Sequence, residues 1–334
     1  MPPPRIDRRS VWNIAQNKAD GCAAKSGNIR AMSRVWESVA PIVPQRALPN
    51  RVSAVGPGVT LEAVPSWFER ERAYAEKDLG KRDTASAQAC LKARFEAGGL
   101  GEICSGPGGT KRKNYEASWE RIRIANLALW LARPSALHVD LVVTAEPDPS
   151  AGGSAIFTTL LESVKPLDNY AEASLTAKHL ALAHNLATAI QLLQHPSTVW
   201  TAVRFLWLAL TEDVWEIRYV NLWVAIEALF GPRKGEHIGA KLRTRVPRFL
   251  NDDDQQAVIA RDIVKNAYKW RSAAVHGSRL AGLGTAEASD LTLKTEGIAL
   301  TTLRKILSNP SLIDEFCAPS RDHYLDALAK GFPP

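Results

Sequence analysis

A helix over Glu212 to Phe230 constrains the fold of this chain more than any other feature of the sequence. Apolar residues recur in it at intervals of four, three, four and three positions, which places them on one stripe of an α-helix. These residues are Trp215, Tyr219, Leu222, Ile226 and Leu229. Gly231 and Pro232 follow in the order that ends a helix. Other helices must therefore pack on this stripe.

The second half of the chain contains further helices. His195-Pro196 ends the first of them, because a residue before proline avoids the helical region. Asn251 to Asp254 supplies side-chain oxygens that can cap another helix. These predicted helices cover about Tyr170–Gln194, Gly235–Leu250, Asp254–His276 and Asp290–Leu307, and Ser197–Leu210 is either a separate helix or continuous with the next.

The first half gives weaker signals. Helical spacing is visible over about Ile29–Val39, Ser66–Phe95 and Tyr115–Ala132, whereas Ala136–Thr144 alternates like a strand. Pro147–Gly153 has the composition of a linker. We therefore predict a mainly α protein in two parts. Residues 1–150 form an α-rich region of unknown role with a little β, including a short strand near 136–144, and residues 155–334 form a helical domain.

The composition is that of a globular protein, with 46% apolar and 23% charged residues. No apolar run approaches the ~20 residues of a membrane span, and the first residues do not resemble a signal peptide. Four cysteines are scattered without a CxxC pair, which argues against a zinc ribbon or a disulfide framework (Cys22, Cys90, Cys104 and Cys317). A cytoplasmic protein is predicted, with no membrane segment and no metal.

Glu227 is the only charge within Leu222–Phe230. A carboxylate on such an apolar helix is expected to be at least half buried, which is costly unless it is paired or protonated. Arg271 and His276 are candidate partners from a neighbouring helix. An ordinary structural ion pair with Arg243 or Arg245 is equally compatible with the sequence.

Basic residues are concentrated just after this helix. The net charge of the chain is +7. The segment Arg233–Arg248 contains six basic residues and one acid, Glu236. This pattern fits either a phosphate-binding surface or a solvated helix face. The candidate phosphate-binding residues are Lys241, Arg243, Arg245, Arg248 and His237.

Arg271 and His276 form an R-x4-H pattern, which carries little information by itself because Arg133 and His138 match it too. The second match contains a proline and runs into the predicted strand, so we discard it. Five positions along a straight helix correspond to about 140° of rotation, so Arg271 and His276 do not share a face. Either the helix unwinds before His276, or a second copy of the chain completes the site.

Three blocks in order, Asn221–Gly231, Lys241–Arg245 and Tyr268–Gly277, resemble the Apea-like branch of the HEPN superfamily over about residues 175–310. The resemblance implies a helical bundle, usually dimeric, that is often a metal-independent endoribonuclease with an R-x4–6-H motif. Arg271 and His276 would then be catalytic, with RNA as substrate and no cofactor. A more polar residue often follows the arginine in this family, whereas here it is Ser272.

The residue types suit this chemistry. Histidine titrates near neutral pH and can move protons, and arginine can hold two phosphate oxygens. Glu227, Ser272 and Tyr268 are candidate supporting residues. The resemblance favours an enzyme in prokaryotic defence or stress response, with a homodimer and a protein partner or antitoxin as further expectations. The alternatives are a non-catalytic HEPN-like module that binds nucleic acid, a nucleotide or a protein, and a scaffold whose N-terminal half holds the function.

Overall fold

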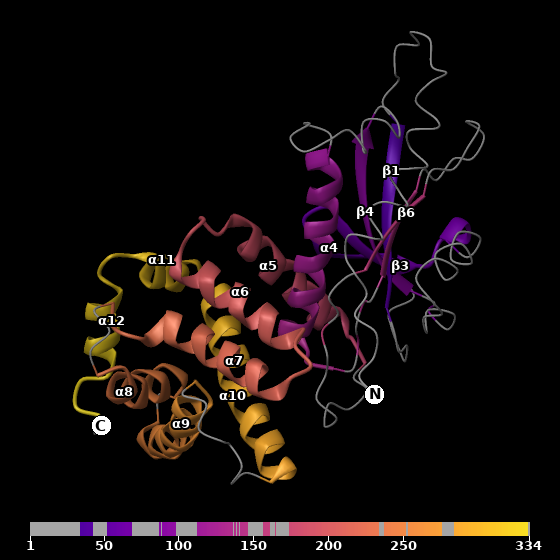
Figure 1. Ribbon diagram of the computed structural model, residues 1–334. Helices are drawn as coiled ribbons and strands as arrows, with labels where there is room; N and C mark the ends of the chain where they lie inside the picture. The colour runs from indigo at the N-terminus through magenta and orange to yellow at the C-terminus, as the bar shows by residue number, and fades with distance from the viewer. Residues whose placement is uncertain are drawn as a thin grey trace.

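The computed structural model places an antiparallel sheet beside a bundle of helices (Figure 1). It describes residues 34–42, 52–68, 87, 89–97, 112–135, 137, 139, 141–145, 156–160, 164, 174–233, 237–251, 253–275 and 284–332. Most of these residues are helical, which confirms the prediction of a mainly α protein. None of the described helices is long and apolar enough to cross a membrane.

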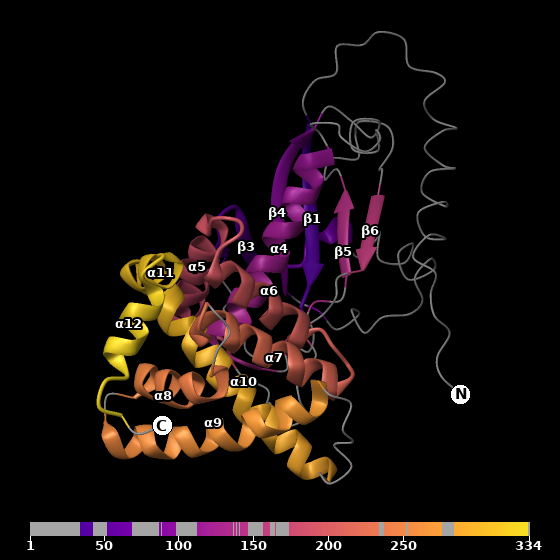
Figure 2. The same ribbon diagram turned by 60° about the vertical axis from the view of Figure 1, so that its left-hand side comes forward.

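The sheet has six strands in the order β2-β3-β4-β1-β5-β6, and every neighbouring pair is antiparallel. The strands are β1 (Arg34–Pro41), β2 (Ser53–Gly56), β3 (Val59–Ala63), β4 (Ala89–Ala97), β5 (Leu141–Ala145) and β6 (Ile156–Leu160). The long helix α4 (Arg112–Ala132) lies along the sheet (Figure 2). The prediction of an α-rich N-terminal region with only a little β is therefore wrong for the described residues.

Two segments that were predicted as helices are strands. β1 contains the end of the expected helix Ile29–Val39, and β4 contains the end of Ser66–Phe95. β4 consists largely of Ala, Leu, Lys, Arg and Glu, which favour helices locally. It nevertheless pairs with β1 on one side and β3 on the other. Pairing and burial in the middle of a sheet outweigh the local preference.

A predicted helix and a predicted strand of the first half agree with the structure. The helix expected over Tyr115–Ala132 is α4, and the strand expected near 136–144 contains β5 in its second half. Ser38 of β1 bonds through its hydroxyl to Ser118 of α4 (3.0 Å) and to Thr144 of β5 (2.8 Å). These contacts fix α4 on the face of the sheet to which Ser38 points. The proposed linker, 147–153, lies outside the described residues.

The helices of the second half lie close to their predicted positions. Ser197 caps α6 by accepting from the Trp200 N–H, so α6 is a separate helix. Two short helices at the C-terminal end were not predicted. The helices are α5 (Ala177–Leu192), α6 (Thr198–Leu210), α7 (Trp215–Phe230), α8 (Ile238–Leu250), α9 (Asp254–Val275), α10 (Thr285–Leu307), α11 (Pro310–Cys317) and α12 (Arg321–Leu328).

One apolar core joins the sheet to the bundle. It runs from Ala40 of β1 through α4 and α5 to Leu325 of α12. β6 completes the sheet although it follows residue 155 in the sequence. The packing of the described residues therefore shows no break at the predicted boundary between 1–150 and 155–334.

Candidate functional site

Glu227 of α7 pairs with Arg271 of α9. The Arg271 Nη2 donates to Glu227 Oε2 over 2.9 Å, and Nε lies 2.8 Å from Oε1 without the alignment of a hydrogen bond. The side chains are 17% and 21% exposed, so Glu227 is mostly buried, as the sequence predicted. Burial raises the pKa of Glu227, and the charge of Arg271 opposes that rise. Arg271 is therefore confirmed as a partner of Glu227, whereas His276, the other candidate from this helix, lies outside the described residues.

Tyr268 borders this ion pair. Its ring packs edge-on against Trp223, with centroids 5.2 Å apart, and the Arg271 guanidinium lies 5.8 Å from the ring centroid. Burial, and then the negative charge of Glu227, raise the pKa of the Tyr268 hydroxyl. The three residues therefore form one cluster at the crossing of α7 and α9.

Gly239 brings α8 up to this cluster. A Cβ at this position would lie 3.0 Å from Tyr268 Cε1 and 3.2 Å from Cδ1. These distances are shorter than ordinary van der Waals contacts, so glycine lets the backbone of α8 approach the ring without displacing it. The sequence analysis missed Gly239, and it missed Trp223 as the support of Tyr268.

A pair of glycine substitutions tests this packing. Gly239→Leu is expected to lower the free energy of unfolding by about 1–3 kcal/mol, because the side chain must displace Tyr268. The loss should appear although leucine favours helices over glycine. Gly297→Ala, inside α10 with nothing within 4 Å of the added Cβ, should instead stabilise by roughly 0.5–1 kcal/mol. Urea denaturation of both variants measures the difference, and a stabilised Gly239→Leu would contradict the geometry.

The remaining motif residues lie at the end of α9. This helix is unbroken through Val275, so it does not unwind between Arg271 and that residue. Ser272 is exposed on it. His276 and Gly277 lie outside the described residues. The structure thus places Arg271, Glu227 and Tyr268 together, and Ser272 one residue further along α9.

The basic helix α8 is less open than the sequence suggested, because none of its side chains is fully exposed. Lys241 Nζ contacts both carboxylate oxygens of Asp326 on α12, at 2.8 and 2.9 Å. Arg248 Nη1 lies 2.5 Å from Asp254 Oδ1. Both side chains are therefore already paired with carboxylates of this chain, and the Lys241 pair is largely solvent-exposed.

Arg245 stabilises the end of α7. It is 1% exposed, and it donates from Nη1 to the Phe230 carbonyl (2.8 Å) and from Nε to Asp326 (3.0 Å). Arg321 of α12 donates to the carbonyls of Ala228 and Gly231, both at 2.6 Å. Cations are favoured at a helix C-terminus. Arg245 therefore has a structural place and presents no open edge to a phosphate, which departs from its predicted role.

Asp322 and Asp326 are the counter-charges that sequence reasoning missed. Asp322 accepts from the Arg233 backbone N–H (3.0 Å), and neighbouring arginines contribute to the lowered pKa of its carboxyl. The signal was present, because the two acids are four residues apart, as are Lys241 and Arg245. Two such pairs can face each other along neighbouring helices.

His237 remains accessible. It is exposed, it precedes α8, and its backbone has a left-handed φ of 53°. Its carbonyl accepts from the N–H groups of Ala240 and Lys241, while its side chain makes no capping bond. The imidazole is therefore available to a ligand, two residues from the contact of Gly239 with Tyr268.

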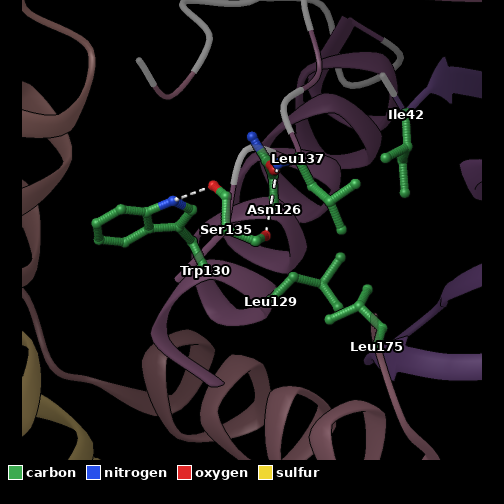
Figure 3. Close-up of a pocket in the computed structure, with 7 residues that line it drawn as sticks. All are labelled: Ile42, Asn126, Leu129, Trp130, Ser135, Leu137 and Leu175. Atoms are coloured by element: carbon green, nitrogen blue, oxygen red, sulfur yellow. Dashed lines mark hydrogen bonds between the residues drawn. The ribbon is translucent and has the colours of Figure 1, made fainter. Parts of the chain in front are cut away.

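A pocket at the C-terminal end of α4 is separate from this cluster (Figure 3). Trp130 Nε1 donates to the Ser135 carbonyl over 3.3 Å, and the other walls are largely apolar. The side-chain nitrogen of Asn126 is buried there without a partner. Elsewhere too, the described residues contain no group of three or more His, Cys, Asp or Glu that could hold a metal ion.

Comparison with known proteins adds no family assignment: no family model matches the chain, and no significant similarity was found among curated proteins or solved structures.

Proposed function

We propose that the chain is a metal-independent endoribonuclease that acts on RNA through Arg271 and His276. The observation that supports it is that Glu227 binds one edge of the Arg271 guanidinium. Glu227 holds its Nε and Nη2 edge at the crossing of two helices, in a half-buried position. The Nη1 edge is left to bind an anion, and a planar guanidinium suits two phosphate oxygens.

The cleavage we propose needs no group beyond the protein and the RNA. The 2′-oxygen attacks the neighbouring phosphorus, its proton passes to a base, and the bond to the 5′-oxygen breaks as that oxygen gains a proton. The products are a 2′,3′-cyclic phosphate and a 5′-hydroxyl. His276 would move the protons, and Arg271 would stabilise the charge of the five-coordinate phosphorus.

Glu227 and Tyr268 would act as positioning residues. The carboxylate fixes the plane of the guanidinium, and the Tyr268 ring bounds it on one side. Because α9 stays helical through Val275, we expect a second copy of the chain to complete the site with its own His276. The proposed setting, prokaryotic defence or stress response with a protein partner or antitoxin, rests on the family resemblance alone.

The test is incubation of the purified chain and its His276→Ala variant with total RNA in EDTA. The wild-type chain should produce fragments that end in 2′,3′-cyclic phosphate, and the variant should produce none. Cleavage that EDTA stops, or that the variant retains, would overturn the mechanism. Salt-sensitive RNA binding without cleavage, unchanged in the variant, would select the non-catalytic binding module instead.

A further inference from the structure

Arg243 is a charge for which the described chain provides no partner. It makes no ion pair with any residue that the structure describes, and its buried Nε has no hydrogen-bond partner among them. The other cations nearby differ from it, because Lys241 and Arg245 contact Asp326 and Arg248 contacts Asp254. A half-buried guanidinium that lacks a counter-charge is costly. An anion from outside the chain would remove that cost.

The packing of α8 on α9 shows what lies opposite Arg243. The two helices run side by side (Figure 2). Gly239 meets Tyr268 at one end of their contact, and Arg248 meets Asp254 at the other. The two helices are therefore antiparallel, so residue numbers decrease along α9 in the direction in which they increase along α8. By this register position 243 of α8 lies opposite about position 261 of α9.

Arg261 occupies that position and points the same way. It lies seven residues before Tyr268, so both are on one face of α9, just as Gly239 and Arg243 are on one face of α8. Its contact with its sequence neighbour Asp262 is at 3.5 Å, and the Arg261 side chain is only 22% exposed. By this register the two half-buried arginines fall at opposite positions where α8 meets α9. Repulsion between them is relieved when an anion bridges both.

We propose that this seam, lined by Arg243 and Arg261, binds a backbone phosphate of single-stranded RNA next to the reacting one. The inference rests on the proposed function, because it gives the RNA a path. Arg271, where the proposed function places the reacting phosphate, lies ten residues along α9 from Arg261, or about 15 Å. A few nucleotides span that distance. Each guanidinium can grip a phosphate through two N–H groups.

The experiment measures binding apart from cleavage. A fluorescent 2′-O-methyl oligoribonucleotide, which lacks the attacking hydroxyl, is titrated with the full-length chain over a series of KCl concentrations. Arg243→Gln and Arg261→Gln should each weaken binding, and the double variant should reduce the slope of log K against log salt by about 0.7, the contribution of one phosphate on a single strand. Arg204→Gln on α6, exposed and outside the seam, removes the same charge and should leave the slope unchanged.

Thermal unfolding separates binding from a structural role. Arg243→Gln should keep or raise the Tm, because among the described residues the guanidinium has no counter-charge and its buried Nε has no hydrogen-bond partner to lose. A lowered Tm, or a double variant with the slope of Arg204→Gln, would overturn the proposal. Seam-dependent binding by a chain that does not cut unmodified RNA would support the seam and reject the nuclease. Cleavage with an unchanged slope would do the reverse.

Discussion

Replacing Arg271 with alanine should lower the rate of RNA cleavage by about 10²–10³-fold, the usual cost of removing one preorganised donor from a developing negative charge. Arg271→Lys should be nearly as inactive. A lysine is a point charge, so it cannot pair with Glu227 along one edge and offer a second edge to phosphate. Single-turnover cleavage of a short RNA measures both variants. A wild-type rate in Arg271→Ala would remove this residue from the mechanism.

The control must separate chemistry from folding. Arg271→Ala leaves Glu227 buried without its cation, so the pKa of the carboxyl, already raised by burial, should rise further. A carboxyl whose folded-state pKa is raised stabilises the fold when protonated, so the stability of this variant should fall as the pH rises through that pKa. Arg271→Ala/Glu227→Gln carries no buried charge there. It should recover stability at neutral pH but not cleavage.

The largest expected effect on stability is at the contact of α7 with α10. Arg218 is 3% exposed and Glu296 0%, and Arg218 Nε and Nη2 lie 3.0 and 2.5 Å from Glu296 Oε2. Glu296→Ala should cost about 3–5 kcal/mol, because it removes the carboxylate that neutralises a buried cation. Chemical denaturation measures the loss.

The same helix supplies a matched control for this prediction. Asp290 and Lys294 form an exposed pair one turn apart on α10, at 2.7 Å. Asp290→Ala should change stability by less than about 1 kcal/mol, since exposed pairs contribute little. The double variant Arg218→Met/Glu296→Leu should recover most of the loss, because it buries no charge. Equal effects of Glu296→Ala and Asp290→Ala would contradict the structure.

Local chemistry made much of the second half predictable. α7 ends at Gly231, where a Cβ would lie 2.5 Å from the Glu227 carbonyl oxygen, so that only glycine fits, and a glycine before a proline already indicated that end. Asp253 accepts from the Gln256 N–H at the start of α9, within the acidic run that predicted a cap. The need of Glu227 for a cation was also visible from its apolar neighbours.

Distant contacts account for what the prediction missed. β4 has the composition of a helix and is a strand because β1 and β3 lie on either side of it. The basic run on α8 does not reveal that Asp322 and Asp326, about 80 residues further on, neutralise part of it. Separation along the sequence does not show which of these distant residues lie close together in space.

The helix over Glu212 to Phe230 shows both what the sequence determined and what only the tertiary structure decided. Its sequence determined that it is a helix, where it ends, and that Glu227, the only charge within Leu222–Phe230, must be paired, because those properties depend on residues within one or two turns. Only the tertiary structure decided that Arg271 is the partner, and that Tyr268 and Gly239 pack beside it. Pairing of charges depends on distances in space, and these follow from how the helices pack.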